Sequence, residues 1–189
     1  MSLLGKITEY LWWRSFNRDK DLIVRNKSVI NYEDAKSISL VYNATSEQEH
    51  LDVLSFGRSL QQQGKLVRAI AYVGYRHLPH YCNPTLSWDF FTLKEVNWFK
   101  RPDSIHIREF LKVETDIMIY LDQDGLLPLE YIAGVARSKY KTGPYNEKFK
   151  DIFDLMIDIK EKVNVNDLIR QIVFYLKMIN KKVDEIQQI

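Results

Sequence analysis

Two β-rich segments, separated by a single helical pattern, constrain the fold of this chain more than any other feature. Residues 37–42 (SISLVY) alternate polar and apolar side chains at their start, and residues 67–75 (VRAIAYVGY) form a second such run. Between them, Ser46 followed by Glu49 has the spacing of a helical capping box. A strand, a helix and a strand in under forty residues predict a βαβ unit with parallel strands and a right-handed crossover.

The alternation continues along the rest of the chain. Further helices are expected at residues 3–17, 104–113 and 129–140 and from Asn166 onward, strands at 116–121 and 152–159, a strand, a short helix or both at 89–99, and a turn at Gly143-Pro144. This order predicts an α/β, three-layer Rossmann-like domain with a largely parallel sheet. We expect a helical extension over residues 1–36, the α/β domain over 37–160 and a C-terminal helix over 161–189.

Composition excludes several classes of protein. The net charge is only +2, so no contact with nucleic acid is expected. Cys82 is the single cysteine, which excludes an intramolecular disulfide framework and is typical of a reducing compartment. No apolar run approaches the roughly 20 residues of a spanning helix, and the first residues do not resemble a secretory signal. We therefore expect a cytoplasmic protein.

Several motifs that carry known chemistry are missing. The segment after the first expected strand, NATSEQEH at residues 43–50, has no glycine, so it is neither a dinucleotide-binding GxGxxG loop nor a phosphate-binding P-loop. The sequence also has no GxSxG elbow and no HExxH pair. No cofactor is expected, no catalytic residue can be assigned, and a non-catalytic protein is favoured over an enzyme.

The candidate binding site consists of polar side chains at the ends of expected strands, where open α/β sheets bind ligands. Its residues are Asn43, Thr45, Ser46, His77, His80, Asp122 and Asp124. Each also has a structural interpretation. The first three can cap a helix, and the two aspartates can form a turn before the next one.

His77, His80 and Cys82 have the donor types that zinc prefers. A structural zinc site needs four ligands, and no second ligand pair is visible near them, so no metal is expected. A nucleophilic cysteine would need a neighbouring base and a lowered pKa. A polar loop with a buried thiol is the favoured interpretation.

The helices at the two ends of the chain are candidates for contacts with partners. Apolar residues of the last helix follow a heptad seam, which packs either on the domain itself or on a second copy: Val165, Ile169, Ile172, Leu176, Ile179, Val183 and Ile186. The first helix packs on the domain, or else lies on an anionic membrane surface through Trp12 and Trp13.

Residues 115–145 (TDIMIYLDQDGLLPLEYIAGVARSKYKTGPY) resemble a segment of heptosyltransferase-type glycosyltransferases. In that family a strand ends in Asp, here Asp122, and is followed by a helix with small residues, a basic strand and a glycine, here Gly143. The resemblance implies a Rossmann-like half-domain. The sequence differs from the family in lacking the glycine-containing loop after the first strand, and 189 residues leave no room for the family's second domain.

The chain as a whole resembles a small bacterial family known only as a domain of unknown function. The resemblance lies in residues 115–145, in FDLMID at 153–158 and in IRQIVFYLKMI at 169–179. We therefore interpret the chain as a module that binds a small ligand or a partner. The alternatives are a small enzyme, or glycosyltransferase-like protein, acting on a phosphorylated or sugar-like substrate, and a peripheral membrane protein.

Overall fold

The computed structural model describes residues 3–179 and contains one six-stranded sheet in which every strand pair is parallel. In sheet order the strands are β3 (Trp88–Thr92), β2 (Leu66–Val73), β1 (Ser37–Asn43), β4 (Thr115–Tyr120), β5 (Ser138–Pro144) and β6 (Leu155–Ile157). The chain thus builds outward from β1 to one edge, returns to the centre at β4, and builds to the other edge. This is the doubly wound Rossmann-like order, and it confirms the expected fold class.

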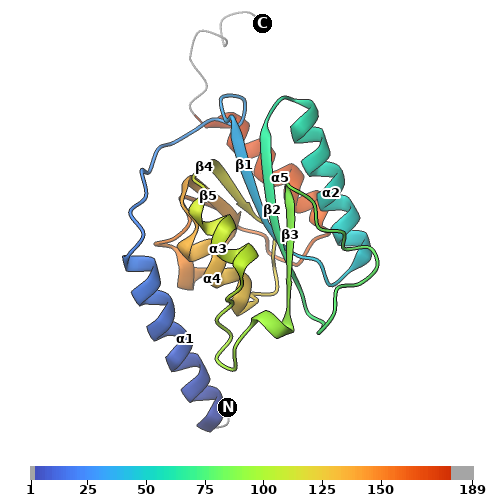
Figure 1. Ribbon diagram of the computed structural model, residues 1–189. Helices are drawn as coiled ribbons and strands as arrows, with labels where there is room; N and C mark the ends of the chain where they lie inside the picture. The colour runs from blue at the N-terminus through green and yellow to red at the C-terminus, as the bar shows by residue number, and fades with distance from the viewer. Residues whose placement is uncertain (1–2, 180–189) are drawn as a thin grey trace, which may run out of the picture.

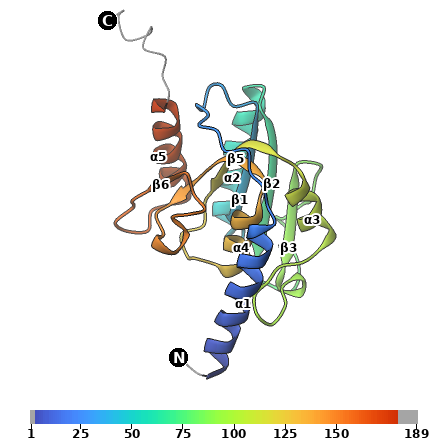
Figure 2. The ribbon, with the colours of Figure 1, turned by 90° about the vertical axis from the view of Figure 1, so that its left-hand side faces the viewer.

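Helices cover both faces of the sheet (Figures 1 and 2). They are α1 (Leu3–Asp21), α2 (Glu47–Gln62), α3 (Ile105–Lys112), α4 (Leu127–Val135) and α5 (Val165–Met178), and two short 3₁₀ turns lie at Leu93–Glu95 and Glu147–Phe149. Helices α2 and α5 pack on one face, α3 and α4 on the other, and α1 packs on the outer side of α4. Each face therefore has its own apolar core.

The βαβ unit expected at the start of the domain is present. Strand β1 pairs with β2 from Ser37 opposite Leu66 to Asn43 opposite Tyr72. The side chain of Ser46 accepts a hydrogen bond from the backbone N–H of Glu49, which caps α2 as the sequence predicts.

The prediction of a helix over residues 129–140 is correct for the first part of this range and wrong for the rest. Helix α4 ends at Val135, and Ser138–Pro144 is strand β5, so the Gly143-Pro144 pair lies in a strand and not in a turn. The strand forms because it is paired on both sides, with β4 and with β6. Pro144 has no backbone N–H to donate to a neighbouring strand, and as the last residue of β5 it leaves the hydrogen bonds of the preceding residues intact.

Two other boundaries differ from the sequence predictions. Strand β6 is limited to Leu155–Ile157, shorter than the expected 152–159. Helix α5 is capped by Asn164 and not by Asn166, because the Asn164 side chain accepts from the N–H of Asp167 at 2.9 Å. The segment at 89–99 is both a strand and a short helical turn, in line with one of its expected forms.

The two terminal helices contribute to the core of the domain. In α5, the seam residues Ile169, Ile172 and Leu176 are buried against the sheet and α2. Ile179 is partly buried against the same core, whereas Val183 and Ile186 lie outside the described residues. Pairing of this seam with a second copy stays a prediction, and it would have to use side chains that this structure already covers.

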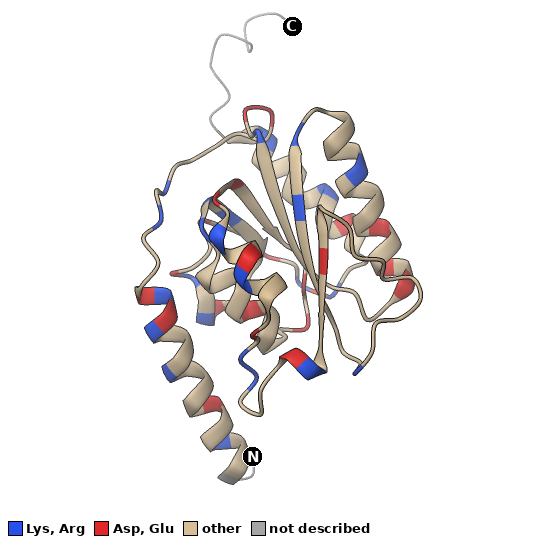
Figure 3. Cartoon of the chain, in the orientation of Figure 1, with Lys and Arg blue, Asp and Glu red and all other residues tan. Residues whose placement is uncertain are grey.

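In α1, Trp12 is fully buried and Trp13 half-buried, so Trp12 offers no exposed ring to a membrane surface in this structure. The expected membrane contact stays a prediction. No helix among the described residues is long and apolar enough to cross a membrane. Basic and acidic residues are interspersed over the helices and loops (Figure 3).

The contact between α1 and α4 depends on Gly134. A Cβ atom at this position would lie 2.1 Å from Cε2 of Phe16, whose ring is fully buried and stacked on Trp12. Glycine in a helix costs about 1 kcal/mol relative to alanine, so its presence here is explained by the close approach of the two helices.

We predict that Gly134→Ala lowers the free energy of unfolding by roughly 1–3 kcal/mol, because overpacking outweighs the gain in helix propensity. Urea unfolding of the full chain measures this change. The double variant Gly134→Ala with Phe16→Leu should recover part of the loss, since the smaller side chain makes room for the new methyl group. A stabilised Gly134→Ala variant would contradict the close contact.

Candidate functional site

A cavity lies at the carboxyl ends of β4 and β5, next to the point where the strand order reverses. Its volume is about 140 Å³. Its polar lining comes mainly from the β4–α4 turn, from α4 and from the segment after β5, and its apolar lining from Phe149, Phe153 and the ring of Tyr120. Doubly wound sheets bind their ligands at this edge, and the cavity is therefore the candidate site.

Asp122 lines the cavity two residues after the end of β4 and is 3% exposed. Its carboxylate accepts hydrogen bonds from the hydroxyl of Tyr120 at 3.0 Å and from the backbone N–H groups of Leu126 at 2.8 Å and Asp124 at 3.3 Å. These bonds fix the turn that leads into α4. Burial raises the pKa of Asp122, and the hydrogen bonds from Leu126 and Tyr120 oppose that effect.

Glu130 extends from the first turn of α4 into the same cavity and is 7% exposed. Its Oε1 accepts a hydrogen bond from Nδ2 of Asn146 at 3.2 Å. Burial, reinforced by the nearby charge of Asp122, raises the pKa of Glu130 to about 7, while Lys148 and Asn146 act in the opposite direction. The cavity thus holds two buried carboxyl groups, and one of them titrates near neutral pH.

The segment that follows β6 closes one side of the cavity. Gln123 holds this segment by two hydrogen bonds, donating to the carbonyl of Val163 at 2.8 Å and accepting from its N–H at 3.0 Å. Lys162, on the same segment, lines the cavity and pairs with Asp124 at 2.6 Å. The lysine that lines the cavity is therefore already paired with a carboxylate other than the two buried ones.

The structure brings together only some of the residues expected at the site. Asp122 lines the cavity, and Asn43 and Asp124 line a much smaller recess beside it, which shares Asp122 and Lys162 with the cavity. Thr45 and Ser46 have backbone partners instead. Oγ1 of Thr45 accepts from the N–H of Gly74 at 3.0 Å, and Ser46 caps α2.

The histidines of the loop after β2 lie away from the cavity. His77 is exposed, with Lys94 as its neighbour at 3.3 Å, and the side chain of His80 is 85% exposed, 3.9 Å from Glu47. Cys82 is buried, and burial raises the pKa of its thiol to about 11. Among residues 3–179, no three or more His, Cys, Asp or Glu side chains are grouped so that they could hold a metal ion.

Most residues of the cavity were not expected from the sequence, among them Glu130, Tyr120 and Asn146. For Glu130 a signal was present, because it is the only charged residue between Asp124 and Arg137. Burying a single acid within an apolar helix is energetically costly. Its presence there is therefore a signal of a functional role. Tyr120 and Asn146 carry no such signal, since a tyrosine in a strand and an asparagine in a loop are ordinary.

Three comparisons with known proteins place the chain. The sequence family described as "Family of unknown function (DUF6913)" matches residues 13–179. None of the curated proteins matches the chain. Among solved structures, one that resembles it is the glycosyl transferase family 9 protein from Veillonella parvula DSM 2008, at 12% sequence identity and a TM-score of 0.46. That likeness covers 82% of this chain, which spans 44% of the solved one.

The elevated pKa of Glu130 predicts how stability depends on pH. A carboxyl whose pKa is higher in the folded state favours folding at low pH, and the effect is lost as the pH rises from the ordinary glutamate pKa of 4.5 through the pKa of about 7 in the folded state. Glu130→Gln stays neutral at every pH. At pH 8 we expect its free energy of unfolding to exceed that of the wild type by roughly 2 kcal/mol, since one pKa unit corresponds to about 1.4 kcal/mol and solvent at the open cavity screens part of the effect.

Denaturant unfolding at pH 5 and pH 8 measures this difference, which should be small at pH 5. The control is Glu161→Gln, an exposed carboxyl on the rim of the same cavity, which should change stability little at either pH. Equal effects of the two substitutions at pH 8 would contradict the buried position of Glu130.

Proposed function

The chain belongs to the DUF6913 family, whose function is unknown, and from the geometry of its cavity we propose that it binds a small polyhydroxylated ligand, such as a sugar. The observation that carries the proposal is the pair of buried carboxyls, Asp122 and Glu130, at the ligand-binding edge of the sheet. Carboxylates accept hydrogen bonds from ligand hydroxyls, and the amide of Asn146 adds a donor and an acceptor.

The charges around the cavity favour an uncharged ligand over a phosphorylated one. Asp122, Glu130 and Glu161 line it, and Lys162 is paired with Asp124. A phosphate group placed beside two buried carboxyls would be repelled at short range. Of the two substrate types expected from the sequence, the sugar-like one is therefore the better match.

The size and the apolar lining of the cavity support the same ligand. About 140 Å³ is small beside the roughly 300–1,000 Å³ of pockets for drug-sized molecules, so a single small ring suits the space. The rings of Phe149 and Phe153 provide an apolar wall. The C–H face of a sugar ring packs on such a wall, while its hydroxyls reach the carboxyls.

A second candidate function is an enzyme that uses Glu130 as a general acid or base on such a ligand. A carboxyl with a pKa of about 7 is suited to proton transfer at neutral pH. Asp122 would then keep that pKa high by its charge, and so act as a positioning residue.

We predict that monosaccharides or cyclic polyols raise the melting temperature of the full chain, because a ligand that binds only the folded state stabilises it. A thermal-shift screen that pairs each compound with its phosphate ester measures this. The unphosphorylated compounds should bind at least as tightly as their phosphates. Binding that requires the phosphate group would contradict the proposal.

The affinity of any ligand found should rise as the pH increases through about 7, because ionised Glu130 is the stronger acceptor. Titration calorimetry at pH 5.5 and pH 8.5 measures the change. In Glu130→Gln we expect weaker binding with no such dependence on pH. In the control Glu114→Gln, which changes an exposed carboxyl outside the cavity, binding should be like that of the wild type. A wild-type affinity that does not change with pH would exclude Glu130 as the acceptor.

A further inference from the structure

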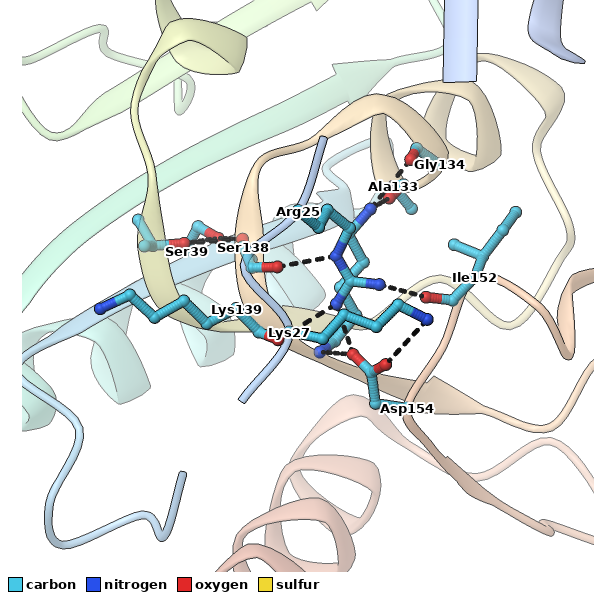
Figure 4. Close-up of polar contacts among 11 residues, drawn as sticks. Arg25, Lys27, Ser39, Ala133, Gly134, Ser138, Lys139, Ile152 and Asp154 are labelled. Carbon is cyan, nitrogen blue, oxygen red and sulfur yellow. Dashed lines mark hydrogen bonds and ion pairs between the residues drawn. The ribbon is translucent and has the colours of Figure 1, made fainter. Parts of the chain in front are cut away.

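A second cavity, of about 300 Å³, lies at the opposite end of α4 from the candidate site. It is bordered by the end of α1, by the linker from α1 to β1, by Gly134 near the C-terminus of α4, and by Lys141 of β5. Figure 4 shows how the linker residues Arg25 and Lys27 meet Asp154 beside the carbonyl groups of α4.

Lys141 borders this cavity from β5. Its side chain is fully buried, and its Nζ donates hydrogen bonds to the carbonyls of Ala133 at 2.6 Å and Gly134 at 2.9 Å. These carbonyls belong to the last turn of α4, where a positive charge is favoured. An ammonium has three N–H donors, and within residues 3–179 it has neither a third hydrogen-bond acceptor nor a carboxylate in an ion pair.

The nearest carboxylate, Asp154, is engaged by other groups. It accepts hydrogen bonds from the guanidinium of Arg25 and from the backbone N–H of Lys141 at 2.8 Å, and Lys27 lies 3.6 Å from it. Burial, together with the charges of Arg25 and Lys27, holds the pKa of Lys141 well below its ordinary value, and Asp154 only partly opposes this. A buried cation without a counter-charge is costly.

The remaining charges of the cavity lie at its rim. Lys20 is 4.0 Å from Asp21, a contact too long to neutralise either charge firmly, and Asp151 is exposed. The side chain of Lys27 is 60% exposed, so it can turn from Asp154 toward a ligand. Arg25 cannot, because its nitrogens also donate to the carbonyls of Ser138, Lys139 and Ile152.

We propose that this cavity is a binding site for a small oxyanion, inorganic phosphate or the phosphoryl group of a small molecule. The anion accepts the third N–H of Lys141 and a hydrogen bond from Lys27, and Lys20 adds a positive charge at the entrance. Such charge-assisted bonds are the strongest that the side chains can offer. Arg25 holds the linker across the cavity and does not touch the anion. The site shares no side chain with the carboxyl cavity.

The probe is inorganic phosphate, titrated into the full chain in a chloride buffer at constant ionic strength and followed by calorimetry and by the ³¹P resonance. We expect saturable binding at one site. Lys27→Gln, which changes an exposed side chain, should weaken it about tenfold, the effect of losing one charge-assisted hydrogen bond. Lys141→Met should abolish it, and its fold is checked by circular dichroism.

The matched control is Lys139→Gln, a lysine of the same strand that pairs with Asp116 outside the cavity. It should bind phosphate like the wild type. Binding that is absent, or that Lys139→Gln and Lys27→Gln weaken equally, would overturn the proposal, because attraction would then come from the overall charge. Sugar binding is tested through Glu130 and phosphate binding through Lys27 and Lys141. Either proposal can therefore fail while the other holds.

Discussion

The buried helix α4 is held by a charged side chain at each of its ends, and both cavities depend on this arrangement. Every residue from Pro128 to Val135 is buried, so water cannot satisfy the free backbone groups of its first and last turns. Asp122 accepts the N–H of Leu126 before the helix, and Lys141 donates to two carbonyls at its end. The helix dipole favours both charges where they lie.

Asp122 and Lys141 also place charges of opposite sign at the two ends of α4. Glu130 lies one turn into α4, close to the Asp122 carboxylate before the helix. Burial raises the pKa of both acids, that of Glu130 to about 7. The ammonium that ends α4 lies near Arg25 and Lys27 instead. A helix of nine residues is about 14 Å long, so an acidic cavity and a basic one lie within a short distance and differ in the ligands they suit.

Much of the fold could be predicted from the sequence because the apolar periodicities of β1, β2 and β4 are strong and local. Strand β5 could not be predicted in this way. Its sequence, SKYKTGP, contains two lysines, a glycine and a proline, all uncommon in strands. What makes it a strand is its place between β4 and β6, together with the carbonyls of α4 that accept Lys141. That interaction is between residues of different elements, and a local pattern cannot show it.

For the site, the sequence predicted binding residues along the carboxyl edge of the sheet, and the structure has its candidate cavity on the β4–β5 half of that edge. At the carboxyl end of β1, the loop after β2 folds back, and the hydroxyl of Tyr81 donates to the carbonyls of Ala44 at 3.3 Å and Thr45 at 2.8 Å. Backbone groups that could meet a ligand there are thereby occupied by the protein. After β4, the carboxylate of Asp122 holds the turn by accepting the N–H of Leu126, and a cavity lies beside Glu130. The hydroxyl of Tyr81 and the carboxylate of Asp122 thus help to determine which half of this edge is covered and which contains a cavity.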